Sequence, residues 1–403
     1  MYFINKNDYD CSGCTACMNI CSHNAITMEK NEEGFLYPVR HNDICVNCGL
    51  CENICPFEHP VYKNDSPLVY AAYDKKERTG SSSGGIFYTI ARYVINRGGI
   101  VYGAAYDDDL KVKHRSARTI QELEALRGSK YVQSDLNDCF KQIKDELKKG
   151  TLVYFTGVGC QVAGLYAYLR KDYSNLLTSD IVCHGSPNQV LFNEHLKYIS
   201  TICHSKVNGY SFRDTRYWLI REKADLSNGK SAIKYDGNLS PYLYAFGLGY
   251  NYRYSCYNCK FAKIPRQGDI SLADFWGISE VLPFISTENG VSLVLINSNR
   301  GQDIWDKIKN NLYFFKSTLE ACTKYNKNVI KPTEEPKIRK DFYKILEKDG
   351  YEKMANTILV CPEKMRNRRI NRIMFLRRLY IYQPYEAFKR YVKFILILNS
   401  ATL

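Results

Sequence analysis

Several hallmarks of common protein classes are missing from this sequence of 403 residues. It contains no run of about 18 apolar residues, the length that a membrane-spanning helix requires. The chain opens on Met1-Tyr2-Phe3-Ile4 without a signal peptide, and it carries no nucleic-acid recognition motif. We therefore expect a protein of the cytoplasm that neither spans a membrane nor binds nucleic acid.

Positive charge is abundant but unevenly placed. The net charge is +14, yet residues 1–60 carry eight acidic and three basic residues, a balance of −5. Residues 363–403 carry ten basic and two acidic residues, a balance of +8. A surface for nucleic acid would not concentrate more than half of the net charge in one terminal segment.

The basic residues of this C-terminal segment alternate with apolar ones, as in an amphipathic helix. They include Arg366, Arg368, Arg369, Arg372, Arg377, Arg378, Lys389, Arg390 and Lys393. Such a helix is typical of proteins that bind a membrane surface, so the sequence predicts a peripheral membrane contact here. The alternatives are a helix docked on an acidic face, such as that of residues 1–60, and a solvated basic tail.

Half of the sixteen cysteines lie in two quartets near the N-terminus, each with the spacing C-x₂-C-x₂-C-x₃-C. The quartets are Cys11, Cys14, Cys17 and Cys21, followed by Cys45, Cys48, Cys51 and Cys55. This spacing is typical of bacterial two-cluster ferredoxins, in which the fourth cysteine of each quartet ligates the other cluster. It predicts one 4Fe-4S cluster on Cys11, Cys14, Cys17 and Cys55 and a second on Cys45, Cys48, Cys51 and Cys21.

Zinc and disulfides are the competing interpretations of these cysteines. Structural zinc usually takes two separate C-x₂-C knuckles with two ligands each, whereas here three closely spaced cysteines sit in one loop. Disulfides do not persist in the reducing cytosol. Two iron–sulfur clusters fit best. Short strands over Tyr2–Ile4 and around Gly34–Pro38 are expected to flank them.

Strands and helices alternate through the middle of the chain. Strands are predicted over 68–73, 100–106, 151–155, 176–182 and 291–297, and helices after Gly85, over 120–127, after Cys160 and over 188–199. This alternation predicts an α/β domain with a mainly parallel sheet, whose loops gather where the strands end. The turns Ser81–Gly85, Gly157–Cys160 and Cys183–Ser186 are therefore expected to be neighbours.

Four further cysteines are expected to lie near these turns. Cys160 and Cys183 lie on two of the turns, and Cys256 and Cys259 form a C-x₂-C knuckle. Four thiolates predict a third 4Fe-4S cluster; zinc in the same ligands and buried structural cysteines are the alternatives. The Ser81–Gly85 loop can present N–H groups and hydroxyls to a phosphate, although an ordinary helix N-cap explains it as well. Lys130 can neutralise a phosphate or a flavin, or lie in solvent.

These motifs, in this order, resemble the family of coenzyme F(420) hydrogenase/dehydrogenase beta subunits over residues 8–300. The resemblance rests on the two quartets, Ser82-Ser83-Gly84-Gly85, Gly128-Ser129-Lys130-Tyr131, Cys160 to Leu165, Val182-Cys183-His184-Gly185, Cys256-x₂-Cys259 and Gly268 to Gly277. It implies an iron–sulfur flavoprotein that binds FAD. By this resemblance the flavin-site residues are Ser81, Ser82, Ser83, Gly84, Gly85, Lys130 and Gly157. One departure is Gly157-Val158-Gly159, where the family usually has Gly-Thr-Pro.

Together these observations predict an α+β multidomain protein: a ferredoxin module over 1–60, an α/β domain that binds flavin and a cluster over 67–330, and a helical basic tail over 331–403. The predicted activity is an oxidoreductase that passes electrons between 4Fe-4S clusters and FAD. Its partner would be a redox protein or a small two-electron carrier such as a deazaflavin. The alternative is an electron-transfer subunit without a substrate site, serving a separate oxidoreductase.

Overall fold

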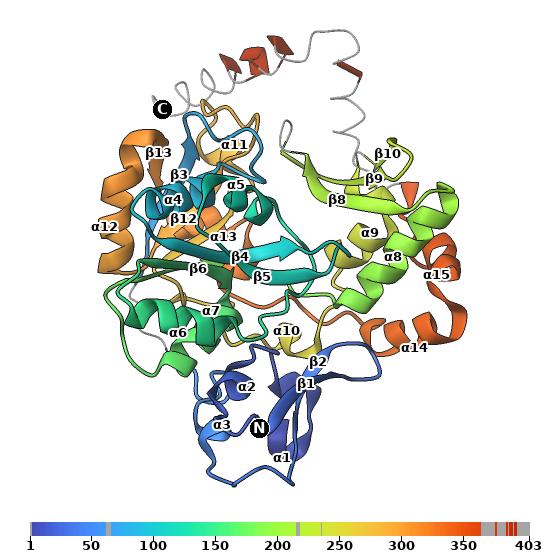
Figure 1. Ribbon diagram of the computed structural model, residues 1–403. Helices are drawn as coiled ribbons and strands as arrows, with labels where there is room; N and C mark the ends of the chain where they lie inside the picture. Colours follow the sequence, from blue (N-terminus) through green and yellow to red (C-terminus); the bar gives the residue numbers. More distant parts are fainter. Residues whose placement is uncertain are drawn as a thin grey trace.

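The computed structural model (Figure 1) describes most of the chain. The described residues are 2–61, 66–214, 218–234 and 236–363, with 375–376, 384–385, 387–389 and 391–392. Most of the basic C-terminal segment, and with it the predicted membrane contact, lies outside these residues. Among the helices that are described, none is both long enough and apolar enough to cross a bilayer.

The first sixty residues form a small unit at one end of the molecule, drawn in blue in Figure 1. Its elements are α1 (Tyr2–Asn5), α2 (Ala16–Ile20), β1 (Ile26–Lys30), β2 (Leu36–Arg40) and α3 (Leu50–Asn53). The strand expected near Gly34–Pro38 is confirmed as β2, which pairs antiparallel with β1. The strand expected over Tyr2–Ile4 is wrong. These residues form one helical turn, and the Tyr2 ring stacks on the ring of Tyr37 with centroids 4.8 Å apart.

A mixed sheet of eight strands forms the centre of the described molecule. Its order is β13 (Leu312–Ser317), β3 (Leu68–Asp74), β12 (Ser292–Ile296), β11 (Ile270–Asp274), β7 (Leu176–Ile181), β6 (Val153–Val158), β4 (Ile100–Tyr106) and β5 (Val112–Ala117). The pairings make β3, β4, β6, β7 and β11 point the same way, while β5, β12 and β13 run opposite to them. The predicted α/β domain with a mainly parallel sheet is confirmed.

Helices cover both faces of this sheet. One face carries α4 (Ile86–Ile95), α5 (Ile120–Leu123) and α12 (Asn299–Ile308), and the other carries α6 (Cys139–Lys148), α7 (Gly159–Leu169), α11 (Ile278–Val281) and α13 (Leu319–Thr323). The spacing of Ile86, Ile90 and Val94 explains the placement of α4, because residues four apart share one face of a helix and all three are buried. In β6 the buried Tyr154 points to one core and Phe155 to the other.

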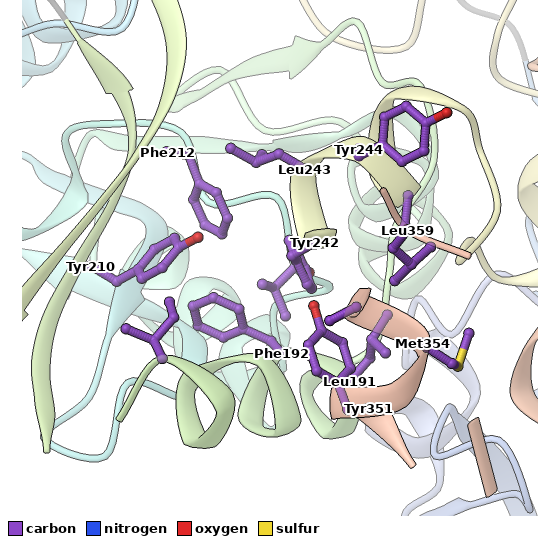
Figure 2. Packing of buried hydrophobic residues seen from close by; sticks show 14 of the residues in the cluster. Leu191, Phe192, Tyr210, Phe212, Tyr242, Leu243, Tyr244, Tyr351, Met354 and Leu359 are labelled. Carbon is purple, nitrogen blue, oxygen red and sulfur yellow. The ribbon is translucent and has the colours of Figure 1, made fainter. Parts of the chain in front are cut away.

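A second sheet, not predicted from the sequence, stands beside the first. It consists of β8 (Val207–Asp214), β9 (Leu219–Leu226) and β10 (Ser231–Lys234), and it packs with α8 (Gln189–Ile202), α9 (Pro241–Gly247), α14 (Arg339–Asp349) and α15 (Tyr351–Thr357). Figure 2 shows Phe192, Tyr210 and Tyr242 meeting in this core. The two C-terminal helices of the described chain are therefore part of the folded body.

Short helical turns complete the described structure. They are α10 (Tyr254–Tyr257), η1 (Asp8–Asp10), η2 (Glu124–Leu126), η3 (Gly237–Leu239), η4 (Lys309–Asn311) and η5 (Lys327–Val329).

The three turns expected to be neighbours do lie on the same side of the main sheet, at the carboxyl ends of its parallel strands. β6 and β7 are adjacent, so the segments that carry Cys160 and Cys183 adjoin each other. The expected turn Gly157–Cys160 is not a separate loop, because β6 continues to Val158 and α7 starts at Gly159. The Ser81–Gly85 loop follows β3, and two strands, β12 and β11, separate β3 from β7. It is thus farther from the cysteines than expected.

Candidate functional site

The first predicted cluster set is brought together in the structure. The charges that act on the Cys17 thiol come from Cys14, Cys11 and Cys55, and also from Cys51. Burial raises the pKa of the Cys14 thiol to about 12, and the neighbouring Cys55 adds to this shift. Cys55 therefore lies with the first quartet, as the exchange of fourth cysteines requires. Thiols with such pKa values are protonated near neutral pH, and iron would displace their protons on binding.

The second predicted set lies at the outer end of the same module. Cys48 is exposed, while Cys45, Cys51 and Cys21 are half-buried. The guanidinium of Arg40 is close enough to both Cys45 and Cys51 for their charges to act on it, and it forms an ion pair with Glu52. The Cys21 sulfur accepts a hydrogen bond from the backbone N–H of Ala25, at 3.3 Å. Of the two sets, this one faces the surrounding solvent.

The four central cysteines line one cavity. Cys160 sits in the first turn of α7, Cys183 follows β7, and Cys256 and Cys259 come from α10 and the segment after it. The cavity encloses about 50 Å³, several times the ~10–15 Å³ that one water molecule needs. Burial raises the pKa of the Cys183 thiol to about 11, and the neighbouring Cys259 adds to this rise. Four thiolates around such a space are a donor set suited to a 4Fe-4S cluster.

Among the described residues, no three His, Cys, Asp or Glu side chains are close enough together to hold a single metal ion. Arg266, which lines the cavity, forms a buried ion pair with Asp180. Asp180 also accepts hydrogen bonds from the N–H of Gly268, at 3.0 Å, and from the Ser271 hydroxyl, at 2.5 Å. These bonds fix the position of β11 against β7.

The ferredoxin module is in direct contact with this cavity. Ser12 and Phe57 of the module form part of its lining. Phe57, Ala163 and Phe261 form a small apolar cluster, against which Cys55, Cys160 and Cys259 pack. One helical turn beyond Cys160 on α7, Gly164 approaches the module so closely that an added Cβ would lie 2.9 Å from the Cys14 Cβ. The first cluster set and the central cysteines are thus neighbours across a tightly packed boundary.

The predicted Ser81–Gly85 loop is held in place by hydrogen bonds to neighbouring segments of the chain. Ser82 Oγ accepts a hydrogen bond from Ser129 N–H at 2.8 Å, and Gly84 N–H donates to Ser292 Oγ at 2.9 Å. Gly84 is required because a Cβ there would lie 2.3 Å from the carbonyl oxygen of Ala72. The Ser83 hydroxyl is buried and has no hydrogen-bond partner among the described residues. It is a free polar group of the kind that a bound cofactor satisfies.

Lys130 lies half-buried next to this loop. Its ammonium donates to the carbonyl oxygens of Arg127, at 2.8 Å, and Ala125, at 3.0 Å. Burial lowers its pKa to about 7. Burial also lowers the pKa of His114 to about 4; the bond to the Thr156 carbonyl opposes that shift and the Lys130 charge adds to it. Because Thr156 precedes Gly157, the two predicted flavin residues Lys130 and Gly157 both lie near His114.

Arg213, which was not predicted, joins the serine loop to the cysteine cavity. Its guanidinium donates to the Ser82 carbonyl oxygen at 2.9 Å and to the Asp274 carboxylate at 2.8 Å. Asp274 in turn acts on His184: burial lowers the pKa of that imidazole and the carboxylate opposes the shift. His184 lines the cavity beside Cys183. Two of these residues, Asp274 and His184, fall in motifs that carried the resemblance, whereas Arg213 has no local sequence signal.

The site and fold define an iron–sulfur protein of the oxidoreductase class, and comparisons with known proteins specify it further. The models for the coenzyme F420 hydrogenase/dehydrogenase beta subunit match residues 69–141 with the N-terminal part and 150–321 with the C-terminal part. A 4Fe-4S dicluster domain matches residues 10–59. The chain therefore belongs to the family of coenzyme F420 hydrogenase/dehydrogenase beta subunits and carries a 4Fe-4S dicluster domain, as the motifs predicted.

Several individual proteins are similar to parts of the chain. One of the subunits of the F(420)H(2) dehydrogenase of Methanosarcina mazei is 23% identical over 244 residues, which are 57% of this chain and 69% of the relative. A ferredoxin of Saccharopolyspora erythraea is 51% identical over 35 residues, 9% of this chain and 33% of the ferredoxin. A chain of the F420-reducing [NiFe] hydrogenase complex from Methanosarcina barkeri aligns with a TM-score of 0.47 and 17% identity, covering 71% of this chain and 93% of that one.

Proposed function

We propose that this chain is an iron–sulfur flavoprotein oxidoreductase that passes electrons between 4Fe-4S clusters and FAD, and from there to or from a two-electron partner. The observation that carries the proposal is the convergence of Cys160, Cys183, Cys256 and Cys259 on a cavity that adjoins the ferredoxin module. The order of centres would run from the exposed Cys48 side, through the set containing Cys14, to the central cysteines.

The proposed flavin position is the region around the serine loop and Lys130. The buried, unpaired hydroxyl of Ser83 and the N-terminal end of α4 after Gly85 are groups that fit a phosphate-bearing cofactor. Arg213, Asp274 and His184 connect this region to the cavity. FAD would supply the conversion between single electrons and hydride-type transfer, which clusters alone do not perform. Since one relative is named as part of an F(420)H(2) dehydrogenase, we propose the deazaflavin coenzyme F420 as the two-electron partner.

The anaerobically purified protein tests this proposal by its content of iron, acid-labile sulfide and flavin. Three 4Fe-4S clusters correspond to about twelve iron atoms per chain, and we expect one FAD. Replacing Cys160 or Cys183 by serine should remove about four iron atoms, since each would lose a ligand of the central cluster. The matched control is Cys203→Ser at the end of α8, a half-buried cysteine outside the cavity, which should leave iron unchanged. Unchanged iron in both cavity variants would exclude a cluster at the central cysteines.

The second candidate function is an electron-transfer subunit that has no substrate site and serves a separate oxidoreductase. It is favoured by the relative in Methanosarcina mazei, which is itself one subunit of a dehydrogenase. Flavin content distinguishes the two functions. A protein that holds its clusters but no FAD, and reduces no small molecule by itself, would support the second function and reject the first.

A further inference from the structure

Arg253 occupies the boundary between the ferredoxin module and the central cavity. It is buried, with 1% of its surface exposed. Its Nε donates to the carbonyl oxygen of Cys11 at 2.6 Å, and its Nη1 donates to the carbonyl oxygen of Leu36 at 2.9 Å. Its guanidinium also lies 3.7 Å from the centroid of the Tyr37 ring. One side chain thus holds two separate segments of the module against the body.

The backbone of the same residue belongs to the cavity wall. Arg253 N–H donates to the Ser186 carbonyl oxygen at 3.1 Å, and its own carbonyl accepts from Cys256 N–H at 2.9 Å. Ser186 and Cys256 both line the cavity. Arg253 therefore contacts a ligand residue of the first cluster set with its side chain and a ligand residue of the central set with its main chain.

The charge of Arg253 is not neutralised by a carboxylate. In the part of the chain that the structure describes, no Asp or Glu lies within ion-pair distance of its guanidinium, and its Nη2 is buried without a hydrogen-bond acceptor. The acidic groups whose charges act on it are Cys11, Tyr37 and Cys256, and at longer range it acts on Asp8. A buried cation without a partner is costly, so anionic groups are expected nearby.

Arg339 provides the contrast. It is as deeply buried and also joins the module to the body, but it is paired with Glu33 by two bonds of 2.8 and 2.6 Å. Arg266, the other buried arginine beside the cavity, is paired with Asp180. Among these three arginines, Arg253 alone has no carboxylate partner, and it lies close enough to Cys11 and Cys256 for the charges of both cysteine sets to act on it.

We propose that Arg253 is the positioning residue of the proposed electron path: it fixes the module against the cavity and raises the reduction potentials of the two clusters that flank it. The inference rests on the proposed function. Each reduction adds one electron to a cluster and makes it more negative, with no bond formed or broken and the neighbouring cluster as donor or acceptor. A fixed positive charge between the two clusters stabilises both reduced forms, and net charge is one of the factors that set cluster potentials.

The test is a redox titration of the anaerobically purified full chain, followed by electron paramagnetic resonance of the reduced clusters. In Arg253→Gln we expect full iron content and, at a fixed applied potential, an approximately tenfold lower ratio of reduced to oxidised cluster for the two flanking sets. That ratio corresponds to about 59 mV for a one-electron step. The outer cluster on the Cys48 side should move much less. Full iron with unchanged potentials in Arg253→Gln would overturn the proposal.

Two further variants separate charge from packing. Arg253→Lys keeps the positive charge and should keep both potentials, even if the glutamine variant loses iron; a tenfold fall of the ratio in a fully loaded lysine variant would overturn the electrostatic role. The matched control is the double variant Arg339→Gln with Glu33→Gln, which removes a buried contact between module and body without changing net charge. Its potentials should not move, and a shift equal to that of Arg253→Gln would show that docking alone sets them.

Failure of the proposed function is recognised separately. If the unaltered protein contains about eight iron atoms, the central cluster is absent and the proposed electron path is wrong. The effect of Arg253 on the cluster bound by Cys11 would still be read from the same titration, because the side chain bonds directly to that residue.

Discussion

Gly164 on α7 is a position of very close contact between the ferredoxin module and the α/β domain. An added Cβ would lie 2.9 Å from the Cβ of Cys14, 3.1 Å from its sulfur and 3.3 Å from its carbonyl oxygen. Unstrained carbon atoms need about 3.5–4.0 Å. Alanine at this position therefore has to displace Cys14, which is buried and belongs to the first cluster set.

Gly164→Ala has two opposing effects on the free energy of unfolding. Replacing glycine by alanine within a helix stabilises it by about 1 kcal/mol, whereas overpacking a close contact costs about 1–3 kcal/mol. Because the neighbouring atoms belong to a ligand cysteine and its backbone, they have little room to move. We expect the cost to exceed the gain, leaving the variant less stable by up to about 2 kcal/mol and altering the signal of the cluster on Cys14.

The assay is thermal unfolding of the anaerobic holoprotein, followed by circular dichroism, with the cluster signals recorded before heating. The matched control is Gly247→Ala at the last residue of α9, where a new Cβ would meet no atom within 4 Å. That variant should be as stable as the native protein or slightly more so. If Gly164→Ala is no less stable than Gly247→Ala and its cluster signals are unaltered, the close approach of α7 to Cys14 does not exist in solution.

Two other predictions concern titratable groups whose pKa values differ from their ordinary values. Lys130→Met should remove a pH dependence: burial lowers the folded-state pKa of Lys130 to about 7, so the unfolded chain binds an extra proton between about pH 7 and 10.5. The melting temperature of the native protein should thus rise relative to Lys130→Met from pH 7 to 9; a flat difference would contradict the burial of Lys130. Glu222→Gln should cost about 3–5 kcal/mol, because it leaves His195 buried without its carboxylate partner. Burial opposes ionisation of Glu222, but the His195 charge and the hydrogen bonds from His195, Ser240 and Tyr210 hold its pKa at about 2. The contribution of Glu222 to stability should therefore be present above about pH 4.5 and be lost as the pH falls toward 2. A melting temperature insensitive to this range would refute the contribution.

The extent to which the sequence predicted the site depends on how local each feature is. The quartets were predicted because their ligands lie within one short loop each, where spacing alone limits what they can hold. Cys160 and Cys183 were expected to meet because consecutive parallel strands bring the residues that follow them to one edge, and the structure places both in one cavity. The family and the mainly parallel sheet were also predicted correctly, because short motifs and the alternation of strands and helices can be read locally along the chain.

Features that depend on distant contacts were missed. Arg253 reaches Cys11 across 242 positions, and Arg213 reaches Ser82 across 131, so neither gives a local pattern. The second sheet was missed because residues 205–250 do not show a clean alternation of polar and apolar residues. Tyr210, for example, buries its ring while its hydroxyl donates to the buried carboxylate of Glu222 at 2.8 Å. The turn at Tyr2 was mistaken for a strand because the Tyr2 ring packs on Tyr37 of β2, whereas its backbone forms a helical turn and does not pair with that strand.

The wall of the central cavity also constrains how the protein is made. Ser12 and Phe57 emerge early in synthesis, whereas Cys256 and Cys259 follow some two hundred residues later, and all four lie in the same lining. The N-terminal quartets have all their ligands as soon as residue 55 has been made. The central pocket gains its last thiol only at residue 259 and its lining only when the N-terminal module has docked. Under the proposed function, the two N-terminal clusters could therefore be loaded on a nascent chain, whereas the proposed central cluster would have to wait until the module has docked.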